Sequence, residues 1–454
     1  MDRRKFLSTA AATGPFLGRV LGANDRIVIG QIGLGSRGYY EVTINLKNPG
    51  VDIAAVCDVY RPLADLTKEK CGSRTEAYSD FRRVLDRKDI DAVFVSTPDH
   101  WHAPITLLAC EAGKDVYCEK PVSHTVAEGR WMVEAARKHN RVVGVGSQQR
   151  SAPHFAKCAE LVQSGYIGDV SAIDCWIVSN EYPQGEGMLA DSAPPAGLDW
   201  DLYLGPASKV AYNRNRYIWN FRWYWDYSGG NMTDWGAHHL DSIHQIMNVR
   251  APKSAYAVGT RKLKDDRDTP DTLLATIEYP TFTVRFTNSQ VGVRMDKYAG
   301  TFIYGTKGAL FVDRGGYEVI PSKFSAIVRS DVDQVEDMLA SRRRAVTGEA
   351  PPPHERMPNP PLCEAVKVTG IKMDPAIQEV HVQNVLDCVK RRRKTAADVA
   401  VGHTSIVPCH LANISYKVGR KINWDSEREQ IIGDPEASKL LTKQYRSPWE
   451  PNRS

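Results

Sequence analysis

Three titratable side chains in this sequence are of the types that move a proton on and off a hydroxyl group. Lys120 belongs to the tripeptide Glu119-Lys120-Pro121, which follows the apolar run 115–118. Asp234 and His238 are four residues apart in a segment of helical character, so both side chains leave one helical face. An imidazole titrates near neutral pH, and an ammonium can stabilise a developing alkoxide. These three residues are therefore the candidate catalytic group.

The same residues have other interpretations. Spacing alone favours a helix N-cap at Asp234 and a core histidine at His238, and Lys120 could be a solvated surface lysine. A metal site is a further interpretation, because Asp241 and His239 crowd the same helix. His238 and His239 are adjacent and cannot share a helical face, and the sequence contains no HExxH motif. We therefore expect no metal.

A glycine-rich turn, Gly33–Gly38 with the sequence GLGSRG, follows the apolar run 26–32 and precedes Asp58 by 20 residues. This is the arrangement of a dinucleotide-binding βαβ unit, in which glycines allow a tight turn and close approach to a pyrophosphate. A carboxylate at Asp58 would accept both adenosine ribose hydroxyls and favours NAD. Arg61 keeps NADP possible, because it could pair with a 2′-phosphate. The alternative is an ordinary α/β domain with a glycine-rich turn and no cofactor.

The elements that must position these residues begin with residues 25–150, where strand and helix patterns alternate. This alternation predicts a Rossmann domain, a doubly wound parallel sheet covered on both faces. Ligands of such sheets bind beyond the carboxyl ends of the strands, so residues that follow strands should converge on one crevice. The residues expected there are Gly33, Asp58, Thr97, Lys120 and Gln148.

The pattern changes near residue 150, and residues 151–454 predict an α+β domain with a large, open, mainly antiparallel sheet. Residues 314–372 lack clear periodicity and are expected to form an excursion, followed by a helical C-terminal segment at 378–454. An aromatic cluster at 217–227 precedes the helix of Asp234. Such clusters are more often core than sugar-binding surface, although aromatic faces do pack on sugar rings.

Composition excludes several classes of protein. The chain has 454 residues, is 42% hydrophobic and 25% charged, and has a net charge of +5, which is too mild to indicate nucleic acid binding. No stretch after residue 25 is long and apolar enough to span a membrane. The nine cysteines form no CxxC motif, which predicts buried free thiols rather than a disulfide framework.

The N-terminus resembles a twin-arginine export signal. Arg3-Arg4 is followed by Phe6-Leu7 and a mildly apolar, alanine-rich stretch to Ala23. We expect a leader over residues 1–24 and a periplasmic or otherwise exported protein; the alternative is a basic tail on a cytoplasmic protein.

Taken in order, the GLGSRG turn, the run Thr97–His102, the Glu119-Lys120-Pro121 tripeptide and the Asp234/His238 segment resemble the Gfo/Idh/MocA oxidoreductase family. This resemblance covers roughly residues 25–315 and implies hydride transfer between a nicotinamide and a carbohydrate carbon. It implies that Lys120, Asp234 and His238 are catalytic, with His238 as the acid/base. Arg150, Tyr224 and Trp225, with Asp234 and His238, are the expected substrate contacts. The expected cofactor contacts are Gly33, Leu34, Gly35, Ser36, Arg37, Gly38, Asp58, Thr97, Pro98, His100, His102, Glu119, Lys120 and Gln148.

The sequence and this resemblance together predict a carbohydrate oxidoreductase that uses NAD, with NADP possible, and assembles as a homodimer or homotetramer. An exported enzyme has no free nicotinamide pool, so we expect a tightly bound cofactor that is regenerated in place. Related enzymes that cleave glycosides by transient oxidation offer an alternative, although they usually depart from the Glu-Lys-Pro motif, which is intact here. A non-catalytic sugar-binding protein is a third possibility.

Overall fold

The computed structural model describes residues 26–293, 297–323, 331–348 and 360–451. The expected export leader, residues 1–24, lies outside the described residues. Within these ranges no helix combines the length and apolar character needed to cross a membrane.

The N-terminal unit is built on a six-stranded parallel sheet with strand order β3-β2-β1-β4-β5-β6. Its strands β4 and β5 are buried throughout, as expected for a sheet covered on both faces. The predicted parallel Rossmann-type sheet is thereby confirmed. The strands are β1 (Ile27–Ile32), β2 (Val51–Cys57), β3 (Glu76–Tyr78), β4 (Ala92–Val95), β5 (Asp115–Cys118) and β6 (Val143–Val145).

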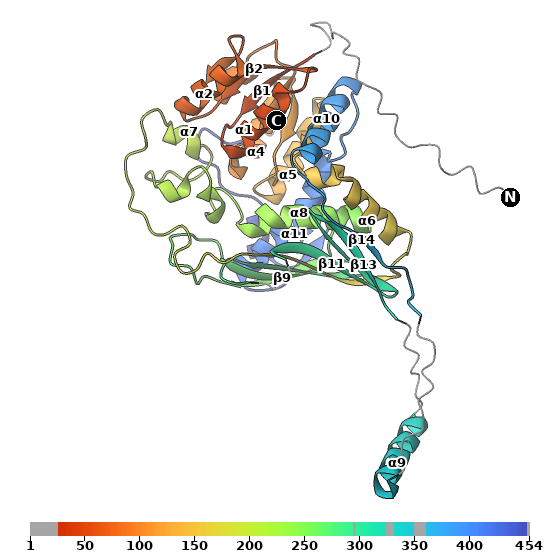
Figure 1. The fold of residues 1–454 in the computed structure, drawn as a ribbon. Coiled ribbons are helices and arrows are strands. Elements are labelled where there is room, and N and C mark those ends of the chain that lie inside the picture. The colour runs from red at the N-terminus through yellow and green to blue at the C-terminus, as the bar shows by residue number, and fades with distance from the viewer. Residues whose placement is uncertain (1–25, 294–296, 324–330, 349–359, 452–454) are drawn as a thin grey trace, which may run out of the picture.

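Helices connect these strands and cover the sheet (Figure 1). The last of them begins at a capping box, in which the Thr125 hydroxyl and the Glu128 carboxylate each accept from the other residue's backbone N–H. The helices are α1 (Ser36–Leu46), α2 (Arg61–Cys71), α3 (Phe81–Leu85), α4 (His102–Glu111) and α5 (Val126–Lys138).

The second unit is a ten-stranded sheet with the order β14-β13-β12-β11-β7-β10-β9-β8-β15-β16. All its pairings are antiparallel except β7 with β10, which confirms the predicted mainly antiparallel sheet. The strands are β7 (Val170–Val178), β8 (Ser254–Thr260), β9 (Thr272–Glu278), β10 (Thr283–Ser289), β11 (Ala299–Gly305), β12 (Gly308–Asp313), β13 (Gly316–Pro321), β14 (Val366–Val368), β15 (Ile422–Asp425) and β16 (Gln430–Ile431).

One face of this sheet carries α6 (Pro153–Gln163), α8 (Asn231–Met247) and α11 (Val399–Val418), and the other face is open (Figure 1). Strand β9 illustrates these two faces, because its side chains alternate between them. Leu273, Ala275 and Ile277 are buried under the helices, whereas Leu274 is exposed on the open face. Short helices lie outside these layers: α7 (Trp200–Leu204) and α12 (Pro435–Ser438).

Strands β13 and β14, at the two ends of the aperiodic range 314–372, pair with each other and extend the sheet. Between them lies α9 (Asp331–Thr347), which stands apart from the sheets in Figure 1. The parts of this range at 324–330 and 349–359 lie outside the described residues.

Helix α10 (Ala376–Arg391) comes late in the chain yet covers a face of the first sheet. Its Val382, Val385 and Leu386 pack with Ile29 of β1 and Phe94 of β4. The Rossmann-type unit is therefore not confined to residues 25–150, because the C-terminal segment completes one of its two covering layers.

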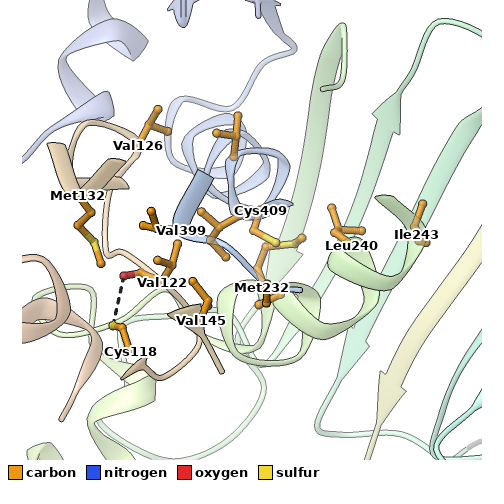
Figure 2. Packing of buried hydrophobic residues seen from close by; sticks show 14 of the residues in the cluster. Cys118, Val122, Val126, Met132, Val145, Met232, Leu240, Ile243, Val399 and Cys409 are labelled. Atoms are coloured by element: carbon orange, nitrogen blue, oxygen red, sulfur yellow. Dashed lines mark hydrogen bonds between the residues drawn. The ribbon is translucent and has the colours of Figure 1, made fainter. Parts of the chain in front are cut away.

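The two units share one hydrophobic core (Figure 2). Figure 2 shows Val126 and Met132 of α5 near Val399 and Cys409 of α11, which in turn neighbour Met232 of α8. Helix α11 contacts both α5 and α8. This core sets the position of α8, which carries Asp234 and His238, against the strand ends of the first sheet.

Candidate active site

A cavity of about 600 Å³ lies between the carboxyl ends of the first sheet and the N-terminal part of α8. Tyr217, Trp219 and Phe221, from a segment rich in aromatic residues, form part of its wall. The strand-end residues expected to converge do so: Gly33, Asp58, Thr97, Lys120 and Gln148 all line it.

The glycine-rich turn at one end of this cavity is tightly packed. Gly33 has φ +87°, and a Cβ on Gly38 would lie 1.9 Å from the carbonyl oxygen of Gly33. Gly35, in contrast, faces open space, and the nearest atom to a Cβ placed there is Ile218 Cγ1 at 4.0 Å. Gly33, Gly35, Ser36 and Arg37 line the cavity, whereas Leu34 and Gly38 support the turn from behind.

These residues fit a dinucleotide. The N-cap residue of helix α1 is Gly35, which has no side chain to cap the helix, so the first N–H groups of α1 are available to a pyrophosphate. Asp58 accepts the N–H of Leu34 and of Tyr60, each at 2.8 Å, and still faces the cavity. Arg61 is paired with Asp65 at 2.7 Å and does not line the cavity, so it leaves Asp58 as the charge at the ribose position.

Arg37 is held by two buried carboxylates. Its guanidinium lies 2.7 Å from Glu119 Oε1 and 3.3 Å from Glu41 Oε1. Burial opposes ionisation of both carboxyls, but at Glu119 the charges of Arg37 and Lys120 and a hydrogen bond with Glu41 together outweigh it and lower that pKa to about 2. Burial and the neighbouring Glu119 charge raise the pKa of Glu41 well above its ordinary value. The Arg37 guanidinium thus lies between two buried carboxyl groups in this wall of the cavity.

Lys120 reaches across the cavity to α8. Its Nζ lies 2.5 Å from Asp234 Oδ1 and donates to the Asp234 carbonyl oxygen at 3.1 Å. Arg222 lies 3.2 Å from the same carboxylate oxygen. Burial would raise the pKa of Asp234, but Lys120 and Arg222 outweigh it and hold that pKa well below its usual range. Asp234 is therefore an ionised anchor for the Lys120 ammonium.

His238 lies one helical turn from Asp234 and lines the same cavity. Neither of its ring nitrogens has a hydrogen-bond partner among the described residues. Burial lowers its pKa well below 6.5, and the positive charges of Lys120 and Arg314 lower it further. A neutral imidazole thus faces the cavity beside an ammonium. The adjacent His239 points away, and its Nδ1 hydrogen-bonds Thr301 on β11 at 3.0 Å.

Several predicted site residues lie outside the cavity. His100 and His102 are buried and hydrogen-bond carbonyl oxygens of the chain, so they hold the strand-end loop in place. Pro98 and Glu119 do line the cavity.

The expected substrate contacts Arg150, Tyr224 and Trp225 do not line the cavity. Arg150 is 2.8 Å from Asp241, and the Tyr224 hydroxyl donates to Asp266 at 2.7 Å. The Trp225 indole N–H donates to the Asp268 carbonyl oxygen at 3.0 Å. Each of these polar groups is already satisfied by a partner from elsewhere in the chain.

The cavity also contains residues that sequence reasoning missed. Tyr217 and Arg222 belong to the aromatic cluster at 217–227, and Trp235 follows Asp234 directly in the sequence. Arg314, at the first position of the aperiodic range, had no signal that could have placed it there. The cavity-lining residues not predicted include Tyr40, Tyr203, Tyr217, Ile218, Trp219, Phe221, Arg222, Trp235, Arg314 and Asp374.

Helix α8 carries four side chains of metal-ligating type, Asp234, His238, His239 and Asp241. Across the described part of the chain, no three His, Cys, Asp or Glu side chains gather as a metal ion would require. Asp234 and Asp241 are instead paired with Lys120 and Arg150.

Comparison with known proteins agrees with this geometry. Residues 27–147 match the model of an oxidoreductase family with an NAD-binding Rossmann fold. Residues 166–317 and 367–451 match the C-terminal α/β domain of the same family. Much of the aperiodic range is therefore additional to the family's common fold.

Among curated proteins, inositol 2-dehydrogenase of Salmonella typhimurium is 30% identical over 120 residues, which are 26% of this chain and 36% of that protein. A glycosyl hydrolase family 109 protein of Shewanella sp. is 33% identical over 162 residues, 34% of this chain and 35% of that protein. The matched stretch is thus about a third of each of these relatives.

The solved structure of a levoglucosan dehydrogenase in complex with NADH and levoglucosan is similar along most of its length. The TM-score is 0.60 at 17% identity, covering 88% of this chain and 99% of that one. At this identity the likeness concerns the fold. With both of its domains matched by the family models, this chain belongs to the Gfo/Idh/MocA oxidoreductase family.

Proposed function

We propose that this protein is an NAD-dependent oxidoreductase acting on a carbinol carbon of a sugar, polyol or sugar derivative. One observation carries the proposal: Lys120 and the unpartnered His238 line the same cavity as the uncapped N-terminus of α1 and Asp58. The groups that suit a dinucleotide and those that suit a hydroxyl proton therefore share one space.

The chain's own residues divide the work at the substrate hydroxyl. His238, neutral and without a partner, accepts the hydroxyl proton during oxidation and returns it during reduction. Lys120 stabilises negative charge on the same oxygen, and Asp234 fixes the position of its ammonium. NAD supplies the hydride acceptor when bound.

The first experiment uses the protein as purified. It is denatured, any released nucleotide is identified, and the native protein is followed at 340 nm against a panel of sugars and polyols. Absorbance changes with one sugar, or with a pair of sugars, support the proposal. Absence of nucleotide binding, together with no response to added NAD, contradicts it.

We also propose that the cofactor is tightly held and that the protein is exported with it. Ile218 comes within reach of the glycine-rich turn, and Trp219 and Phe221 continue the wall that covers this part of the cavity. Stoichiometric NAD(H) after dialysis supports tight binding.

The export leader is tested with a double variant, Arg3→Lys with Arg4→Lys. If the leader directs export, this variant should stay in the cytoplasm while the unchanged chain is exported.

Glycoside cleavage by transient oxidation is a second candidate, favoured by the similarity to a glycosyl hydrolase family 109 protein. It predicts release of the aglycone from aryl glycosides with no net accumulation of NADH. Net NADH formation from a free sugar favours the first candidate instead, as does the intact Glu119-Lys120-Pro121 motif.

Assembly into a homodimer or homotetramer is proposed to use the open face of the large sheet. That face carries the exposed apolar side chains Tyr256, Val258, Leu274, Tyr304 and Ile320. Light scattering after size-exclusion chromatography measures the assembly, and Leu274→Glu should shift it toward the monomer.

A further inference from the structure

Of the four cations that line the cavity, Arg314 alone forms no ion pair with a carboxylate of the described residues. Arg37 pairs with Glu119, while Lys120 and Arg222 share Asp234. Arg314 makes one hydrogen bond, from its Nε to Gln149 Oε1 at 3.2 Å. A cation in a partly buried site without a counter-ion is unfavourable, and natural sites compensate it.

The guanidinium of Arg314 is held in a defined place. Its Cζ lies 4.9 Å from the centre of the Trp235 ring. Gln149 is itself fixed, because its amide donates to Ser242 at 2.8 Å. The stack and the hydrogen bond orient the side chain while leaving both Nη groups without a partner among the described residues. Two adjacent N–H groups in one plane match the two oxygens of a carboxylate.

Arg314 is also close to the proposed base. Trp235, on which it stacks, lies edge-on to His238 with ring centres 6.0 Å apart. The charge of Arg314 helps to keep His238 neutral, as expected for neighbours that face one space. A group bound by Arg314 would therefore belong to the same small molecule whose hydroxyl meets His238.

The remaining carboxylates of the cavity form no ion pair with Arg314 among the described residues. Burial lowers the pKa of its guanidinium below the ordinary value, and the negative charges of Asp374 and Asp234, which raise that pKa, do not outweigh burial. Asp99 accepts from the Ser228 hydroxyl in the buried loop after β4, and Asp374 accepts from the Tyr40 hydroxyl at 3.3 Å. The three cations near Asp234 and His238, namely Lys120, Arg222 and Arg314, have one directly paired carboxylate, Asp234, which pairs with Lys120 and Arg222.

We propose, building on the oxidoreductase function above, that the substrate is an acidic sugar whose carboxylate is bound by Arg314. A carboxylate fits better than a phosphate, because among the described residues of the cavity only this one cation lacks a carboxylate partner, and a phosphate dianion calls for more donors. Arg314 is thus the specificity residue, and Lys120 and His238 act on a hydroxyl of the same ring.

The test measures binding by isothermal titration calorimetry on the full chain saturated with NAD. The probes are D-glucuronate and D-galacturonate, with D-glucose and D-galactose as their neutral counterparts and D-glucose 6-phosphate as the phosphate probe. At least one uronate should bind about 10- to 100-fold more tightly than its neutral counterpart, the range of a charge-assisted hydrogen-bonded pair. Arg314→Gln should abolish this preference, and Arg314→Lys should retain part of it.

A control variant, Arg428→Gln, removes the same charge from an exposed side chain of the same unit and should leave the preference unchanged. Thermal unfolding and NAD affinity of each variant check that the fold and the cofactor site are intact. Equal binding of uronates and neutral sugars overturns the proposal, as does tighter binding of the phosphate than of both uronates. A loss in Arg314→Gln that falls on NAD rather than on the uronate also overturns it.

The outcomes separate this inference from the function on which it rests. If neutral sugars are turned over at 340 nm and uronates are not preferred, the oxidoreductase function is supported and the binding of a carboxylate by Arg314 is contradicted. Arg314-dependent uronate binding without any redox change supports the acidic ligand and contradicts the oxidoreductase.

Discussion

At the scale of single residues, the cavity is governed by which charges are paired. The Lys120 ammonium pairs with Asp234 and also faces the cavity. His238 is the neutral counterpart, because burial and two neighbouring cations disfavour its protonation. This combination gives a base that is ready at neutral pH next to a cation that stabilises the oxygen it deprotonates.

Replacing Lys120 by Met removes the cation and keeps most of the side-chain volume. We expect kcat to fall by about 100- to 1000-fold, the usual effect of losing one stabilising donor at a developing oxyanion. NAD affinity should stay within about threefold, because the pyrophosphate and ribose positions are untouched. Steady-state kinetics at 340 nm and nucleotide titration measure both, and a kcat within tenfold of the unchanged protein would show that Lys120 is misassigned.

The pH dependence follows from His238. Its folded-state pKa lies well below 6.5, so the base form persists through neutral pH and is lost only as the pH falls through that lower value. We expect kcat/KM for oxidation to keep its value at pH 6.5 and to decline only at lower pH, as the pH falls through the lowered pKa of His238. In Lys120→Met the imidazole loses a neighbouring positive charge, so its pKa should rise. NMR titration of His238 checks this, and an unchanged or lower pKa would contradict the assigned cause.

At the scale of elements, the glycines of the glycine-rich turn have two different roles, close packing of the helix on the turn and close approach of a ligand. Gly38 lets α1 approach the turn, since a Cβ there would lie 1.9 Å from the Gly33 carbonyl oxygen. Gly35 has φ −60°, which any residue adopts, and only the cavity lies in front of it. Gly38 therefore serves the packing of the protein, and Gly35 serves the approach of a ligand.

Alanine at each position distinguishes these roles. Gly38→Ala should lower the free energy of unfolding of the apoprotein by about 1–3 kcal/mol, because the helix must shift to admit the methyl group. Gly35→Ala should change it by about 0.5 kcal/mol or less and yet weaken NAD binding at least about tenfold. Denaturant titration and nucleotide binding provide the two readouts. Equal destabilisation by both changes would refute the division of roles.

At the scale of the whole molecule, the two sheets are joined by helices from the C-terminal part of the chain. Helix α10 covers the first sheet, and α11 packs on α5 and α8 at once. The C-terminal stretch also reaches the first unit, where Lys443 pairs with Glu128 at 2.9 Å and Trp449 packs edge-on against Trp101. The largest buried cluster therefore joins residues from both units.

We therefore expect one cooperative thermal transition. Leu240→Ala, in the shared core of Figure 2, should lower the free energy of unfolding by about 2–5 kcal/mol without splitting the transition. The matched change Leu66→Ala, on the exposed side of α2, should have an effect of about 0.5 kcal/mol or less. Differential scanning calorimetry measures both, and two separate endotherms in the unchanged protein would contradict the shared core.

The sequence by itself determined the features that depend on local periodicity and backbone sterics. The parallel unit, the mainly antiparallel unit and the helix of Asp234 and His238 all follow from apolar spacing, and the structure contains that helix as α8. The glycine-rich turn and Asp58 were recognisable because a close backbone approach restricts which residues are possible.

Only the tertiary structure decided which of the charged side chains are free. Arg150 faces Asp241, 91 residues away in the chain, and so leaves the cavity, whereas Arg314 enters it from a hairpin with no recognisable pattern. The pairing of Lys120 with Asp234 likewise joins residues 114 positions apart. The physical reason is that an ion pair depends on distance in space, and local sequence carries information about neighbours within a turn or a strand only.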